Sequence, residues 1–140
     1  MKFFVYTDGA SRGNPGKSAS GYAIYDDKFN LVKEYVFYNG IATNNVAEYK
    51  AIIAALKEAI KLGADEIVLF SDSKLAISQL QGKYKIKSAN LKQLNNEAKG
   101  LLLSLKSYKL ENPRRENAYI SSVDKMLNRF LDSLEKKSDG

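Results

Sequence analysis

The chain has 140 residues, the usual size of a single domain, and contains neither cysteine nor histidine. Without cysteine it has no disulfide framework and no thiolate metal site, and without histidine it has no imidazole base. The 22 Lys and Arg residues exceed the 16 Asp and Glu residues, and this net charge of +6 favours a polyanionic partner. Any catalysis therefore uses carboxylates, lysine, tyrosine, hydroxyls or a metal ion held by oxygen.

The hydropathy pattern indicates one domain without a membrane span. No apolar run approaches the roughly 18 residues that a transmembrane helix needs. The apolar start is interrupted at Asp8, too soon for a signal peptide. We therefore expect a cytoplasmic monomer that does not contact membranes. The domain is expected to span residues 1–135, followed by a loose tail at residues 136–140.

The first part of the chain predicts an antiparallel meander. Residues 1–7 form an apolar run rich in β-formers, typical of a central strand buried on both faces, and the run ends at Asp8-Gly9. A segment rich in Gly, Ser, Asn and Pro at residues 10–20 predicts a loop. Two further strands are expected at residues 21–26 and 31–38.

The rest of the chain alternates helices and strands. Apolar residues at helical spacing predict a helix over residues 44–62, and a clear amphipathic pattern begins at Val123. A strand that is reached through a helix is usually parallel to an earlier strand. The other expected elements are a strand (66–70), a helix (73–80), a basic loop (83–88), a helix (91–105) and a strand (107–110).

Two acidic residues follow the two most apolar strands. Asp8 ends the first strand, and Asp72 comes just after the strand at residues 66–70. If these strands are parallel neighbours, both carboxylates emerge at the same sheet edge, where open α/β sheets bind ligands. Glu48, near the start of a helix, would face them. Three such carboxylates would repel one another and raise one another's pKa unless a divalent cation lay among them.

Each acidic residue also has a purely structural explanation. Asp8 and Gly9 can form a turn, and Asp72 can simply precede a helix cap. Two pairs have the spacing of a capping box: Asn45 with Glu48, and Ser121 with Asp124. These explanations do not account for the convergence of Asp8, Glu48 and Asp72 in one place. Their oxygen ligands suit Mg²⁺ or Mn²⁺, and a pair of such ions can cleave phosphodiesters without histidine.

Three motifs resemble those of type 1 ribonuclease H in order and approximate spacing. They are Thr7-Asp8-Gly9-Ala10-Ser11 with Gly13-Asn14-Pro15-Gly16, then Thr43-Asn44-Asn45-Val46-Ala47-Glu48, then Ser71-Asp72-Ser73. The pattern of strands, helices and basic loop through Leu105 is similar to that family as well. The resemblance implies an α/β ribonuclease H-like fold: a five-stranded mixed sheet, its first three strands antiparallel, flanked by helices on both faces.

The resemblance further implies that four carboxylates bind two Mg²⁺ ions, with Mn²⁺ as a substitute. The first three are Asp8, Glu48 and Asp72. The fourth normally follows an asparagine at the start of the last helix, and Asp124 follows Asn117 at more than the family's usual separation. We take Asp124 as the fourth ligand. Glu116 is the alternative, and without an insertion the position falls on Ser121, which leaves the site one ligand short.

The substrate implied by the resemblance is an RNA/DNA hybrid held in its shallow minor groove. Asn44 and Asn45 match positions that contact the nucleic acid beside the scissile bond, where a 2′-hydroxyl distinguishes RNA from DNA. Asn14 and Thr43 match positions near the DNA strand and its phosphates. Capping or turn chemistry is the alternative for these four residues, and for Asn45 both roles can hold.

A short basic segment stands where some bacterial members carry an extended basic protrusion. The segment is Lys83-Tyr84-Lys85-Ile86-Lys87, in which lysines stand at alternate positions with an aromatic side chain between two of them. Such a pattern suits a row of contacts to phosphates. We expect Lys85, Lys87 and Asn90 to contact the hybrid, and a solvated loop is the alternative. Isolated cations elsewhere are weaker candidates of the same kind: Arg12, Lys17, Arg114 and Arg115.

The implied enzyme is an endoribonuclease that hydrolyses the RNA strand of a hybrid, leaving 5′-phosphate and 3′-hydroxyl ends. One Mg²⁺ would generate the attacking hydroxide while the other stabilises the leaving 3′ oxygen. Many members carry a histidine before the last motif, and its absence here bears on turnover, not on reaction type.

Two alternatives stay open. One is an integrase, resolvase or exonuclease of the same fold superfamily that acts on DNA, against which the Asn44-Asn45 pair and residues 13–16 argue. The other is a non-catalytic module that binds hybrid or RNA, which would fit if Asp124 is not a ligand.

Overall fold

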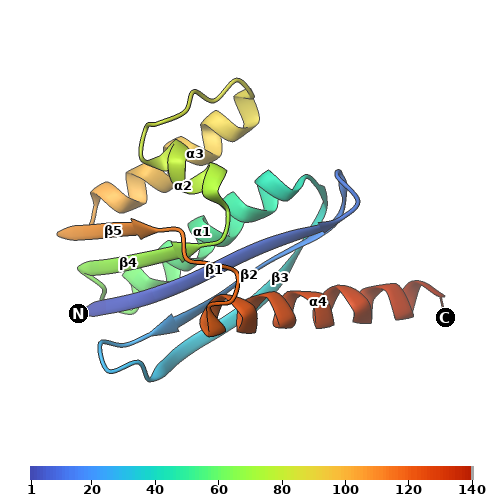
Figure 1. Cartoon of the computed structure of the whole chain (residues 1–140), viewed down its shortest axis with the longest axis horizontal. Helices are drawn as coiled ribbons and strands as arrows, with labels where there is room; N and C mark the ends of the chain where they lie inside the picture. The colour runs from blue at the N-terminus through green and yellow to red at the C-terminus, as the bar shows by residue number, and fades with distance from the viewer. Residues whose placement is uncertain (140) are drawn as a thin grey trace.

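The computed structural model describes residues 1–139 and contains one mixed five-stranded sheet in the order β3-β2-β1-β4-β5 (Figure 1). The first three strands are antiparallel, and β4 and β5 run parallel to β1. The strands are β1 (Lys2–Arg12), β2 (Gly16–Tyr25), β3 (Leu31–Ala42), β4 (Glu66–Ser71) and β5 (Ser107–Glu111). The predicted mixed sheet is confirmed.

Helices cover both faces of this sheet. On one face lie α1 (Asn44–Lys61), α2 (Lys74–Leu80) and α3 (Ala89–Leu103), and on the other lies α4 (Ala118–Asp139) (Figure 1). The central strand β1 serves both cores, because its side chains alternate between the two faces. Phe3 and Val5 pack in the core under α1 and α3, whereas Tyr6 packs with Ile120 of α4.

The segment expected as a loop at residues 10–20 is mostly strand. β1 continues to Arg12 and β2 begins at Gly16, and the antiparallel pairing between them is continuous. The composition suggests a loop, but pairing between the strands satisfies the backbone hydrogen-bonding groups. As a result Asp8 and Gly9 lie inside β1, and the turn explanation for them is wrong.

The N-cap of α1 lies two residues before Asn45, the cap that the spacing suggests. Thr43 is the N-cap, and its Oγ1 accepts a hydrogen bond from the backbone N of Val46 at 3.2 Å. Asn45 therefore lies inside the helix and does not form a capping box with Glu48, which leaves the Glu48 carboxylate without a capping role.

The last helix begins earlier and ends later than predicted. Asn117 Oδ1 accepts hydrogen bonds from the first turn of α4, so Ser121 lies within the helix and does not cap it for Asp124. At the other end, the helix continues through the expected tail as far as Asp139. Gly140 lies outside the described residues. Among those described, no helix has the length and apolar character to cross a membrane.

Gly9 is the point of closest approach between β1 and α1. A Cβ atom placed there would lie 2.3 Å from the carbonyl carbon of Ala47 and 2.5 Å from the backbone N of Glu48. These are backbone atoms that cannot move without shifting the helix. A glycine at this position therefore lets α1 contact the strand that carries Asp8.

We expect Gly9→Ala to lower the free energy of unfolding by about 3 kcal/mol, because it forces β1 and α1 apart. The matched control is Gly100→Ala, a glycine inside α3 with open space around its Cα. That change should raise the free energy of unfolding by about 0.5–1 kcal/mol. Urea denaturation measures both. Equal stability of the Gly9→Ala variant and the unaltered protein would contradict the close approach.

Candidate active site

Asp8 and Asp72 emerge together from two neighbouring parallel strands. Thr7 of β1 pairs with Ser71 of β4, so the residues that follow them, Asp8 and Asp72, lie at the same level along the two strands. Asp72 directly precedes Ser73, the N-cap of α2. Glu48 reaches both from α1, and one carboxylate oxygen from each of Asp8, Glu48 and Asp72 lies within 4.8 Å of the others. The predicted convergence of these three residues is present in the structure.

Two of the three carboxylates are buried. Asp8 is 3% exposed and Glu48 is 8% exposed, while Asp72 is half-buried. The backbone N of Gly9 donates to Asp8 Oδ1 at 2.9 Å, and Ser71 Oγ donates to Glu48 Oε2 at 3.4 Å. In the described part of the chain no lysine or arginine forms a salt bridge with either buried group. In the described part of the chain, neither buried carboxyl group is therefore paired directly with a protein cation.

The electrostatic consequence is a raised pKa for both groups. Burial, followed by the nearby charges of Glu48 and Asp72, raises the pKa of Asp8. Burial and the charge of Asp72 raise the pKa of Glu48. Clustered carboxylates of this kind are able to hold a divalent cation, which would remove the repulsion.

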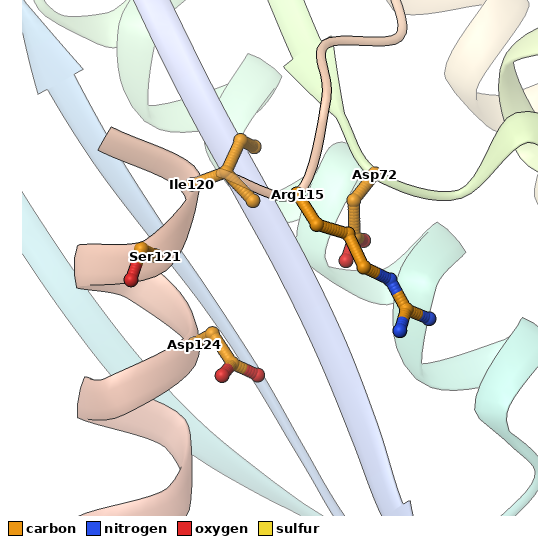
Figure 2. A pocket seen from close by; sticks show the side chains of 5 residues that line it. All are labelled: Asp72, Arg115, Ile120, Ser121 and Asp124. Carbon is orange, nitrogen blue, oxygen red and sulfur yellow. The ribbon is translucent and has the colours of Figure 1, made fainter. Parts of the chain in front are cut away.

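Asp124 lies across a hollow from this cluster. It is exposed on α4, and its carboxylate and that of Asp72 both point into the hollow, from opposite sides (Figure 2). Its charge adds to the rise in the pKa of Asp8. Asp124 is outside the group of three that meet within 4.8 Å. Of the alternatives, Ser121 lines the hollow, whereas Glu116 is exposed and is not among the described residues that line it.

The hollow continues from Asp124 and Asp72 to the start of α1. Asn44 and Asn45 line it beside the three carboxylates, together with Gly9 and Ala10. Two asparagine side chains at one end and four carboxylates along the floor and opposite side make a strongly polar cleft. Such a cleft suits a phosphodiester with metal ions and disfavours an apolar ligand.

The other predicted substrate residues are not among the described residues that line this hollow. Thr43 caps α1, and Asn14 Oδ1 accepts a hydrogen bond from the backbone N of Asn44 at 3.1 Å. For both residues the structural role is therefore real. Lys85 and Lys87 are exposed in the connection between α2 and α3, and Asn90 is exposed in the first turn of α3.

One cation in the hollow is a stronger candidate for substrate binding than the sequence suggests. Arg115, in the loop before α4, lines both parts of the hollow, and its side chain extends beside Asp72 (Figure 2). In the sequence it is one of four isolated cations with equal claims, because the spacing of a single arginine carries no signal. Arg12, by contrast, is engaged with three partners on α4 and is not free to bind phosphate.

Comparison with known proteins decides the family. The family model described as reverse transcriptase-like matches residues 6–126. A crystal structure of RNase H1 from Halobacterium salinarum superposes with a TM-score of 0.89 at 35% identity, covering 95% of this chain and 99% of that one. The chain belongs to the ribonuclease H family.

Two further matches show what this ribonuclease H family member is similar to. The structure of LC11-RNase H1 in complex with an RNA/DNA hybrid has a TM-score of 0.79 at 34% identity, covering 92% of this chain and 99% of that one. A bifunctional protein of Mycobacterium tuberculosis is 38% identical over 135 residues, which is 95% of this chain. The chain spans 36% of the length of that relative.

The raised pKa values of this ribonuclease H family member have a measurable consequence for stability. A carboxyl group whose pKa is higher in the folded than in the unfolded state stabilises the fold at low pH. This stability is lost as the pH rises from the unfolded pKa through the folded one. The free protein should therefore become less stable as the pH rises above the ordinary carboxyl range, and the loss comes from Asp8 and Glu48.

We expect Asp8→Asn to raise the free energy of unfolding by roughly 1–3 kcal/mol at pH 7.5 in EDTA, because it replaces a carboxyl group whose ionised form is disfavoured by burial and by the neighbouring carboxylates. Mg²⁺ should raise the melting temperature of the unaltered protein and should have little effect on this variant. Asp124→Asn is the control, and as an exposed change it should alter stability in EDTA only slightly. Thermal unfolding at several pH values measures this, and a less stable Asp8→Asn variant in EDTA would contradict the electrostatic account.

Proposed function

We propose that this protein is an endoribonuclease that hydrolyses the RNA strand of RNA/DNA hybrids. The observation that carries the proposal is the meeting of Asp8, Glu48 and Asp72 where β4 ends beside β1, with Asp124 across the hollow, in a ribonuclease H family chain. The hybrid-bound structure of LC11-RNase H1, which this chain resembles over 92% of its length, supports the choice of substrate.

The donor set fits two Mg²⁺ ions, with Mn²⁺ as a substitute, because every candidate ligand is a carboxylate oxygen. Asp8, Glu48, Asp72 and Asp124 would hold them. When bound, such a pair of ions activates the attacking water and stabilises the leaving oxygen of an in-line displacement. In this proposal the products carry 5′-phosphate and 3′-hydroxyl ends.

The buried and the exposed carboxylates would have different roles in holding the ions. Asp8 and Glu48 are buried and held by hydrogen bonds, which suits a rigid floor for the ions. Asp72 and Asp124 are more exposed and face the hollow from opposite sides, which suits contact with ions that also touch the substrate (Figure 2). A site with this division needs no histidine.

Substrate recognition is assigned to the residues around the hollow. Asn44 and Asn45 line it and would read the 2′-hydroxyl groups of the RNA strand. Asn14 and Thr43, next to them, would approach the DNA strand. The exposed residues Lys85, Lys87 and Asn90 would extend the contact to more distant phosphates. We further propose that the protein acts as a cytoplasmic monomer and that one catalytic domain includes all of α4.

The decisive assay uses end-labelled RNA/DNA hybrid with matched DNA/DNA and RNA/RNA duplexes, in Mg²⁺, Mn²⁺ and EDTA. We expect metal-dependent cutting of the RNA strand of the hybrid, with 3′-hydroxyl ends that a polymerase extends. Asp124→Asn should lower kcat by about 100-fold or more, as loss of a group at the reacting centre does. Glu116→Gln, eight positions earlier and outside the hollow, should retain activity.

Other outcomes of this assay identify other functions. Cutting of the DNA duplex while the hybrid survives would indicate a DNA-acting enzyme of the same fold. Metal-independent binding of the hybrid with no cutting in either metal would indicate a binding module. Loss of activity in Glu116→Gln with full activity in Asp124→Asn would exchange the two residues as fourth ligand.

Arg115 is proposed to bind the phosphate at the cleavage site, since it is the only arginine or lysine among the described residues that line the hollow. An arginine–phosphate contact is charge-assisted and strong. We expect Arg115→Ala to lower kcat/KM for the hybrid by about tenfold, which corresponds to one such contact. Arg114→Ala, the neighbour in sequence, is the control and should change kcat/KM less than about twofold. Equal effects of the two changes would indicate general attraction by the loop's charge.

A further inference from the structure

The turn between β1 and β2 (residues 12–16) is held from the α4 face of the sheet by a single arginine. Arg12 Nη2 donates to Asp132 Oδ1 at 2.9 Å and to Asn128 Oδ1 at 3.1 Å, and Arg12 Nη1 donates to Glu135 Oε1 at 3.1 Å. The three partners lie on successive turns of α4. The planar guanidinium thus joins the end of the hairpin to this helix with a fixed orientation.

The same turn is joined to the start of α1 on the opposite face. The backbone N of Ser11 donates to Asn44 Oδ1 at 2.9 Å, and the backbone N of Asn44 donates to Asn14 Oδ1 at 3.1 Å. Ser11 Oγ also donates to the carbonyl oxygen of Ala42 at 2.8 Å. Both the side chain and the backbone of Asn44 are therefore held by the hairpin, through Ser11 before Gly13 and Asn14 after it.

A third link returns to the carboxylate hollow. Asn128, which accepts from Arg12, donates through Nδ2 to the carbonyl oxygen of Asp124 at 3.0 Å. Contacts consequently run from Asn44, which lines one end of the hollow, through the hairpin and Arg12 to the helical turn that carries Asp124 on the other side. This chain of hydrogen bonds connects the two sides of the hollow through the hairpin.

Stability alone gives little reason for this arrangement. The side chains of Arg12, Asp132 and Glu135 are 32%, 58% and 46% exposed, and ion pairs at such exposure contribute little to the free energy of folding. A forked, multiply bonded arginine still restricts position and orientation, because several bonds must break together before the turn can move.

We propose that Arg12 is a positioning residue that ties the β1–β2 turn to α4 and so sets the distance between Asn44 and the Asp124 turn across the hollow. The part of this inference that concerns substrate rests on the proposed function, whereas the part that concerns Asn44 is a property of the free protein. Arg12 itself does not contact substrate. Its effect on binding passes through Asn14, Ser11 and Asn44.

The first test measures amide hydrogen exchange by NMR in the free protein, without metal or substrate. Arg12→Met removes the bonds and keeps much of the apolar stem, and the pair Asp132→Asn with Glu135→Gln removes two partners from the other side. Both should speed exchange at the backbone N–H groups of Asn44 and Ser11 by about tenfold, as expected for a local opening that has lost part of its protection. Lys57→Met is the matched control, since it removes an exposed salt bridge to Glu97 at 2.9 Å on another part of the surface.

The second test measures kinetics on the hybrid. Arg12→Met should raise KM by about tenfold with kcat changed less than about threefold, because a displaced binding group weakens substrate binding more than chemistry. Lys57→Met should change neither. Combining Arg12→Asp with Asp132→Arg re-creates an ion pair in reverse and should recover part of the KM that Arg12→Asp alone loses.

The two tests separate failure of the inference from failure of the proposed function. The positioning role would be overturned if hydrogen exchange at Asn44 and Ser11 were unchanged both in Arg12→Met and in the Asp132→Asn, Glu135→Gln variant. It would also be overturned if Arg12→Met lowered the melting temperature and left KM unchanged. If the unaltered protein cuts no hybrid at all, the proposed function fails. Faster exchange at Asn44 in Arg12→Met would still establish that Arg12 positions the β1–β2 turn.

Discussion

The structure depends on holding like charges together at the edge of a buried sheet. Parallel pairing of β1 with β4 places Asp8 and Asp72 at one level, and the missing side chain of Gly9 lets α1 bring Glu48 against them. Burial and mutual repulsion oppose this arrangement, and the raised pKa values of Asp8 and Glu48 are the result. The two cores on either side of the sheet supply the free energy that the cluster costs, as is common where function requires an unfavourable arrangement.

Around this rigid floor the hollow has two sides of different construction. The α1 side carries Asn44 and Asn45, and Asn44 is held by hydrogen bonds to the β1–β2 turn. The α4 side carries an exposed carboxylate, Asp124, on a helix that packs on the opposite face of the sheet. Because the two sides belong to different layers, their separation depends on contacts that cross the hairpin, and Arg12 joins the hairpin to three side chains of α4.

Sequence patterns predicted the elements well where hydrophobic periodicity was strong and less well where polar residues hide pairing. The helix at Asn44–Lys61 and the strand at Glu66–Ser71 agree with prediction to within a residue. The segment at residues 10–20 was expected as a loop, because small polar residues resemble a loop in composition. Only the partner strand shows that their backbone groups are paired. The start of α4 was missed for another reason, because the apolar periodicity becomes clear only from Val123, whereas the helix is capped by Asn117.

By itself the sequence determined the chemistry available to this protein: no thiol, no imidazole, and acidic residues at the ends of apolar strands in motifs that resemble one family. It could not decide which polar side chains face the hollow, because that depends on crossing elements distant in the chain. Arg12 and Arg115 are indistinguishable as isolated cations in sequence. In the tertiary structure Arg12 binds side chains of α4, whereas Arg115 lies beside Asp72. The sequence cannot show this, because each partner is more than 40 residues away and only packing brings it near.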